Sequence, residues 1–164
     1  MQDEMNESIA LSKATQSLSE LLPSILAEPA LEYGTNFDEL TVKIPSKLIR
    51  PICKTLKSHS DTVFDYLMCL SVVDYENLLE INYHLFSYTK RHKMVLKCDL
   101  NPTQPTISSV SNIWRAANWF ERESHDLFGV VFDDHPSLDR LLLPDDFEGN
   151  PGLKSYPLHE YKEW

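Results

Sequence analysis

The spacing of hydrophobic residues predicts a chain that mixes helices and strands. Helical spacing covers residues 7–22, 46–57 and 109–128, and strand-like runs cover residues 30–33, 40–44, 63–73, 78–88 and 93–100. Pro23 should end the first helix, and a turn over residues 34–36 should join the first two strands. Three closely spaced runs favour an antiparallel meander. The predicted fold class is therefore α+β, with helices packed on one mainly antiparallel (mixed) sheet.

The longest predicted helix, residues 109–128, has a stripe at helical spacing that contains one acid. The stripe comprises Val110, Trp114, Ala117, Glu121, Ser124 and Phe128. Gly129 follows, where a helix commonly ends in a left-handed residue. We expect residues 1–129 to form a single α+β domain.

Residues 130–164 have a different composition. Four prolines and two glycines, all beyond Gly129, argue against a long helix or a central strand in this part of the chain. Apolar and aromatic residues are nevertheless frequent there, at Phe132, Leu141, Leu142, Phe147, Tyr156, Tyr161 and Trp164. We interpret the segment as an extended, Pro-rich, acidic C-terminal tail that docks on its own domain and on a partner subunit.

Charge and composition narrow the classes of function. The chain of 164 residues has a net charge of −10, which disfavours nucleic acid as a partner. Hydrophobic runs are too short for a membrane span, and the acidic start at residues 1–4 does not resemble a signal peptide. Cys53, Cys69 and Cys98 are too widely spaced for a disulfide framework or an iron–sulfur site, so we expect reduced thiols.

No motif predicts catalysis or cofactor binding by this chain. Four glycines make no phosphate-binding loop, and no nucleophile elbow or cysteine–histidine signature occurs in the sequence. We therefore expect a subunit without catalytic residues, cofactor or metal of its own, rather than a self-sufficient enzyme.

The end of the long helix concentrates charged residues at positions that can meet. Arg122 and Asp126 are four residues apart, as are Glu121 and His125. Glu121 also lies on the apolar stripe, where a carboxylate must find a partner or stay protonated. Three interpretations are open: a buried network holding helix to tail, a contact surface for another protein, and acid–base chemistry. Glu121 itself is either protonated or paired with a cation such as Arg140.

A metal site is a weaker alternative. His125, Asp126, Asp133, Asp134 and His135 have the right side chains, but the two histidines are ten residues apart across a helix end. No spacing there places two ligands on one helical face. A turn at His135 and Pro136 that fixes the tail explains the same residues.

The segment from residue 121 to residue 142 resembles the signature of the C-type subunit of the proton-translocating NADH–quinone oxidoreductase, respiratory complex I. The matching residues are Glu121, Arg122, Glu123, Asp126, Leu127, Phe128, Gly129, Val130, Phe132, His135, Pro136, Leu138, Arg140, Leu141 and Leu142. Weaker similarity extends over roughly residues 30–157. After Pro151, family members commonly carry an Arg and an Asp that this chain lacks, although Lys154 is kept.

The resemblance implies a peripheral-arm subunit with no redox centre, beside the large hydrogenase-like (D-type) subunit near the quinone site. FMN and iron–sulfur clusters are then expected in partner subunits, and the complex at the cytoplasmic face of the inner (plasma) membrane. The alternative is the equivalent subunit of a membrane-bound energy-conserving hydrogenase or F420H2 dehydrogenase. Structural or subunit-interface roles are expected for Glu121, Arg122, Glu123, Asp126, Phe128, Gly129, His135, Pro136, Arg140 and Lys154.

Overall fold

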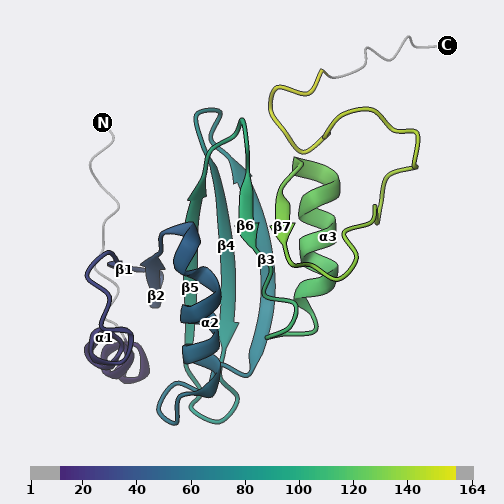
Figure 1. Cartoon of the computed structure of the whole chain (residues 1–164). Coiled ribbons are helices and arrows are strands. Elements are labelled where there is room, and N and C mark those ends of the chain that lie inside the picture. The colour runs from purple at the N-terminus through teal and green to yellow at the C-terminus, as the bar shows by residue number, and fades with distance from the viewer. Residues whose placement is uncertain (1–11, 158–164) are drawn as a thin grey trace, which may run out of the picture.

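The computed structural model describes residues 12–157, which form helices, a mixed sheet and an irregular C-terminal segment (Figure 1). The helices are α1 (Lys13–Leu26), α2 (Ile49–Ser58), preceded by the 3₁₀ turn η1 (Ser46–Leu48), and α3 (Ala117–Phe128). The strands are β1 (Glu32–Asn36), β2 (Glu39–Lys43), β3 (Tyr66–Asp74), β4 (Leu79–Phe86), β5 (Lys93–Leu100), β6 (Thr106–Ser108) and β7 (Val131–Asp133).

Five strands form one mixed sheet in the order β1-β2-β5-β4-β3. Strands β3, β4 and β5 form the predicted antiparallel meander, whereas β2 pairs in parallel with β5, with Val42 opposite Leu96. Strands β6 and β7 make a separate parallel pair. The predicted α+β fold with a mixed sheet is confirmed.

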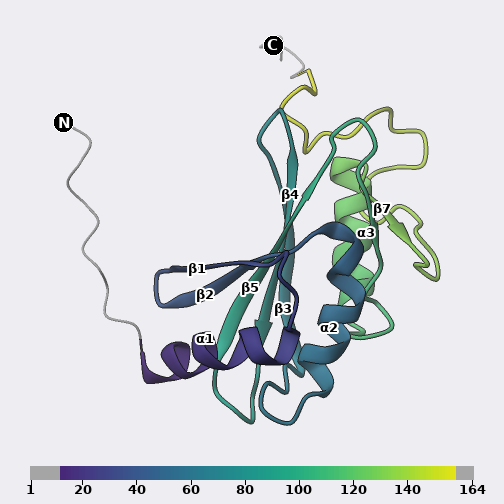
Figure 2. The same cartoon turned by 60° about the vertical axis from the view of Figure 1, so that its left-hand side comes forward.

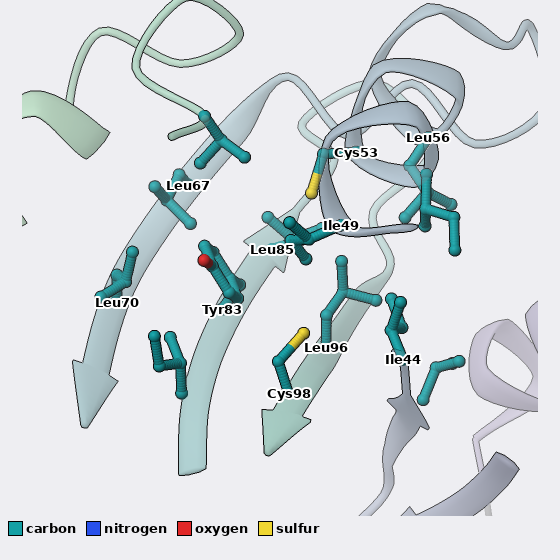
Figure 3. Packing of buried hydrophobic residues seen from close by; sticks show 14 of the residues in the cluster. Ile44, Ile49, Cys53, Leu56, Leu67, Leu70, Tyr83, Leu85, Leu96 and Cys98 are labelled. Carbon is teal, nitrogen blue, oxygen red and sulfur yellow. The ribbon is translucent and has the colours of Figure 1, made fainter. Parts of the chain in front are cut away.

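The core lies between the sheet and helices that pack on it. Figure 3 shows Cys53 and Leu56 of α2 facing Tyr83, Leu85 and other apolar residues of the central strands. These side chains have almost no exposed surface. Helix α1 adds Leu18 and Leu22 to the same core beside β2, and α3 lies along the edge strand β3 (Figures 1 and 2).

Two predictions near the N-terminus are wrong in detail. Pro23 does not end the first helix: α1 continues for one more turn, because Leu26 packs on the core, and ends at Ala27 in a left-handed conformation. Residues 7–11 of that predicted helix lie outside the described residues. The turn between β1 and β2 is at Phe37 and Asp38, both at positive φ, rather than at residues 34–36.

Pro51 is compatible with α2 because it occupies the third helical position. The N–H groups of the first helical turn have no partner within the helix, so a proline there removes no hydrogen bond.

The predicted helix over residues 109–128 is eight residues too long at its start. Residues 109–116 form turns, and α3 begins at Ala117. The N–H of Ser109 bonds to the carbonyl of Asp133 and that of Val110 to a side chain of α3, so these residues join the β6–β7 pair. Val110 and Trp114 are buried as the stripe predicted, but they do not belong to the helix.

Beyond α3 the chain forms β7 and then turns without further helix or strand as far as residue 157. This segment runs back beside α3 (Figure 1). The division of the chain at residue 129 stays a prediction. Cys53 and Cys98 are buried free thiols, and Cys69 is a half-buried one. Among the described helices, none is long and apolar enough to cross a membrane.

Candidate functional site

Glu121 is the buried centre of the site, on the side of α3 that faces the domain. Its Oε1 accepts a hydrogen bond of 2.7 Å from the N–H of Val110, and its Oε2 accepts one of 2.6 Å from the hydroxyl of Ser109. Nε2 of His135 lies 3.8 Å from Oε2, and both side chains are almost fully buried. Burial raises the pKa of Glu121 to about 7, against the opposing effect of the two hydrogen bonds.

Arg50 of α2 ties together the loops that enclose Glu121. Its Nε donates to the carbonyl of Ser109 at 3.0 Å, and Nη2 donates to the carbonyl of Asp133 at 2.9 Å. Nη1 lies 2.6 Å from the carboxylate of Asp134. The guanidinium also acts on Glu121 through its charge and works against the rise in the pKa of that carboxyl. One side chain thereby fixes the ends of both short strands.

Asp126, about one and a half helical turns beyond Glu121, binds the backbone of the tail. Its Oδ2 accepts three hydrogen bonds, from the N–H groups of Leu141, Leu142 and Leu143, at 3.1, 2.7 and 2.9 Å. Nη1 of Arg140 lies 3.8 Å from Oδ1. Burial alone would raise the pKa of Asp126, but the amides and Arg140 outweigh it and lower the pKa.

Arg122 binds the same tail segment through its carbonyl groups. Its Nε donates to the carbonyl of Asp139 at 3.0 Å and its Nη2 to the carbonyl of Arg140 at 2.9 Å. The guanidinium also lies 5.3 Å from the centre of the exposed ring of Trp119. Asp126 therefore binds the N–H groups, and Arg122 the carbonyl groups, of one stretch of backbone.

The C-terminal end of α3 is packed closely against the returning chain. Gly129 ends the helix at φ 73°, with its N–H bonded to the carbonyl of His125. Gly152 donates its N–H to the carbonyl of Leu127 at 2.8 Å. A Cβ at residue 152 would lie 2.8 Å from that carbonyl oxygen and from the ring of Phe128, so the approach requires glycine.

Neither pair that helical spacing allowed is formed. Arg122 bonds to tail carbonyls instead of Asp126, and Asp126 has Arg140 as its cation. His125 donates from Nδ1 to the carbonyl of Val130 at 2.8 Å instead of meeting Glu121. The tail competes successfully with neighbouring helical side chains because it offers backbone groups that would otherwise be buried without partners.

The remaining predicted site residues lie at the surface of the molecule. Glu123 and Pro136 are exposed. The N–H of Lys154 donates to the carboxylate of Asp74 at 2.8 Å, and its ammonium lies 3.9 Å from Glu76, so the end of the tail is fixed near β3. No group of three or more potential metal ligands occurs within residues 12–157.

Sequence reasoning missed three contributors: Arg50, Ser109 and Asn150, whose Nδ2 donates to the carbonyl of Asp126 at 3.0 Å. Arg50 looks like an ordinary surface residue of a helix, and its partners are 59 and more residues away. No local signal marks such a residue.

The chain is similar to known proteins over most of its length. The family described as "Respiratory-chain NADH dehydrogenase, 30 Kd subunit" matches residues 42–162. The C-type subunit of the NADH-quinone oxidoreductase of Roseiflexus sp. (strain RS-1) is 35% identical over 153 residues, which cover 92% of this chain and 87% of that protein. A C-type subunit of the NADH-quinone oxidoreductase of Rhizobium etli (strain CIAT 652) is 34% identical, with 86% and 81% covered.

Two solved structures have a similar fold. A trypsin-resistant fragment of Nqo5 aligns with a TM-score of 0.62 at 22% identity, over 73% of this chain and 98% of the fragment. A chain of the membrane-bound sulfane sulfur reductase, an archaeal respiratory membrane complex, aligns with a TM-score of 0.74 at 25% identity, over 87% of this chain and 86% of that one.

Proposed function

Since the chain belongs to the family of the 30-kDa subunit of respiratory-chain NADH dehydrogenase, we propose that it is a scaffold subunit of a proton-translocating NADH–quinone oxidoreductase. In this role it supports assembly and the quinone-reducing region beside the large hydrogenase-like subunit, in the peripheral arm at the cytoplasmic face of the membrane. Redox chemistry, with its FMN and iron–sulfur clusters, belongs to the partner subunits.

The observation that carries this role is how α3 uses its charged side chains. Asp126 and Arg122 both bind backbone groups of residues 139–143. These contacts hold an irregular segment rigidly against a helix and so create a defined surface. Apolar side chains remain exposed on or beside it, with Trp119 60% and Leu142 58% exposed. Preformed surfaces with exposed aromatic and aliphatic anchors are typical of protein interfaces.

Affinity purification of the tagged chain from solubilised membranes of its own host tests the proposal. We expect it to co-purify, in equal amounts, with NADH- and flavin-binding subunits and to co-migrate with NADH–quinone reductase activity on native gels. Deletion of its gene should remove that assembled complex. Recovery of the chain alone, with the complex intact in the deletion strain, would contradict the proposal.

The similarity to the archaeal sulfane sulfur reductase supports a second candidate. In that case the chain is the equivalent subunit of a membrane-bound complex with another electron donor or acceptor, such as an energy-conserving hydrogenase. The same purification separates the two, because a nickel-binding large subunit, or the absence of NADH- and flavin-binding chains, identifies the second.

A further inference from the structure

Two adjoining hollows lie on the side of the molecule where α2 approaches the start of α3. One, of about 480 Å³, lies between α2 and the turn that follows β6, with Lys54, Lys57 and Ile113 in its wall. The other, of about 690 Å³, lies between that turn, the first residues of α3 and the turn at Pro136. Asn112 lines both, so the two hollows adjoin at this residue, and we refer to them together as the groove.

The groove is positively charged on a protein whose net charge is −10. Lys54, Lys57 and Arg115 are exposed, and none of them has a carboxylate partner among residues 12–157, although the ammonium of Lys57 donates to a backbone carbonyl. The acid in its wall, Asp134, is already paired with Arg50. Most other lysines and arginines of the described chain are paired, as Lys43, Lys93, Lys97, Arg140 and Lys154 are.

The groove also offers apolar surface between its charges. Trp119 is 60% exposed along one wall, and its ring is held by the guanidinium of Arg122. Ile113 lines the smaller hollow together with Lys54 and Lys57. A groove lined by both cationic and apolar side chains suits an extended peptide that carries acidic side chains together with an aromatic or aliphatic one.

Beyond Pro136, no residue of the described tail, as far as residue 157, lines this groove. The groove adjoins the N-terminal end of α3, whereas the tail is bound at Asp126 and Leu127 near its C-terminal end and then at Asp74. Helix α3 has 12 residues and so is about 18 Å long. The groove is nevertheless connected to the site around Glu121. Arg50, which encloses Glu121, also binds Asp134, and Asp134 lies in the wall of the groove.

We propose that this groove, lined by Lys54, Lys57, Arg115 and Trp119, binds an acidic, extended segment of a partner subunit. The inference rests on the proposed function, since it names the chemistry by which another chain of the complex is recognised. The segment's carboxylates pair with the three cations of the groove, and its apolar side chain covers Trp119 or Ile113.

A cross-linking experiment on the assembled complex identifies the occupant. The photoreactive probe is benzoylphenylalanine in place of Asn112, with the same probe in place of Arg91, in the exposed turn between β4 and β5, as the control position. We expect the Asn112 probe to react with one acidic stretch of one partner chain, and the Arg91 probe to leave that stretch unmodified. Cross-links to this chain's own residues 1–11 or 158–164, to a neutral or basic stretch, or to nothing would overturn the proposal.

Charge reversal tests the electrostatic part. The triple variant K54E/K57E/R115E should weaken incorporation into the complex by roughly tenfold, because each exposed ion pair contributes only a modest amount. The single variant Arg91→Glu should have no effect. Acid-to-lysine changes in the cross-linked stretch should restore incorporation of the triple variant.

Circular dichroism at equal protein concentration checks that the triple variant is folded. We expect it to be folded, because all three replaced side chains are exposed. Normal incorporation of a folded triple variant would refute the groove as a binding site and leave the proposed function intact. Failure of the unaltered chain to co-purify with any complex would instead refute the proposed function.

Discussion

Glu121 lies between Ser109, Val110 and His135 with no exposed surface, and burial raises its pKa from 4.5 to about 7. A carboxyl whose folded pKa is above the unfolded one stabilises the fold fully below pH 4.5, and this contribution is lost as the pH rises to about 7. The loss amounts to up to about 3 kcal/mol. Glu121→Gln should remove it, so the variant should be more stable than the unaltered chain at pH 8 and similar to it at pH 5.

Urea unfolding of both proteins at pH 5 and pH 8 measures this difference. Burial lowers the pKa of His135, so this residue makes the free energy of unfolding rise with pH, opposite to the effect of Glu121. His135 is present in both proteins and enters both measurements. Glu123→Gln is the matched control, since Glu123 is exposed on the same helix and its replacement should leave the pH dependence unchanged. Equal pH dependence in Glu121→Gln and the unaltered chain would show that Glu121 stays charged through this range.

Replacement of Arg122 by Ala removes two charged-donor hydrogen bonds, to the carbonyls of Asp139 and Arg140. It strands no carboxylate, because Asp126 has its own partners. We therefore expect a loss of about 2 kcal/mol in the free energy of unfolding. Arg122→Lys keeps the charge but not the fork that reaches both carbonyls, and should recover less than half of the loss. Full recovery by Lys would mean that charge alone matters here.

The burial of Glu121 could be predicted from sequence, because helical spacing places it in line with Ala117 and Ser124. Its partners could not. Ser109 and Val110 reach it only because the chain turns before α3, and His135 reaches it from beyond β7. Helical spacing describes contacts within one element, whereas the carboxyl meets groups from two other segments that only the complete fold brings together.

At the scale of elements, the attachment of the tail to α3 depends on the charge of Asp126. Asp126→Asn should weaken the bonds from the amides of residues 141–143, which then exchange at least tenfold faster with deuterium at neutral pH. The unaltered chain should show the same release only in acid, since a lowered folded pKa preserves its contribution above about pH 4. Asp146→Asn, at an exposed acid further along the tail, is the control. Unchanged exchange in Asp126→Asn would assign the attachment to Arg122 instead.

Gly152 controls a second attachment, at the end of α3. Gly152→Ala places a methyl group against the carbonyl of Leu127 and the ring of Phe128, and should break the bond between residues 152 and 127. We therefore expect faster proteolysis within the part of the chain that follows Asn150, and no change in the sheet. Ser155→Ala, at an exposed site three residues on, should leave the cleavage rate unchanged. Equal cleavage of the two variants would show that the tail yields by a small shift at residue 152.

Element prediction succeeded where hydrophobic alternation was long and failed where side chains compete with the backbone. The strand at residues 93–100 was predicted to the residue, and its neighbours in the meander to within a few residues. Strands β6 and β7 were missed because three residues carry too little pattern. The helix start was misplaced because Val110 is buried for a reason other than helix formation, namely its place beside β6.

In the whole molecule, acidic and basic residues are concentrated in different parts of the chain, and this distribution matches the acidic tail and the basic groove. Residues 1–42 and 121–164 each have a net charge of −7, whereas residues 43–120 have a net charge of +4. The groove draws Lys54, Lys57 and Arg115 from that central part. An acidic tail fixed by α3 and a basic groove beside it would give the subunit two contacts of opposite sign, which favours one orientation in the complex.

Removal of residues 144–164 tests whether folding and assembly can be separated. The shortened chain keeps Leu141, Leu142 and Leu143 on Asp126 and Arg122 on its carbonyls, but it lacks the bonds that Asn150 and Gly152 donate to the end of α3. It loses Leu153, which packs only partly on the core, and we expect a folded protein with a Tm lower by a few degrees. The same protein should fail to enter the complex on native gels. A shortened chain that is unfolded by circular dichroism would place the end of the tail in the domain's own core, and one that assembles normally would exclude it from the interface.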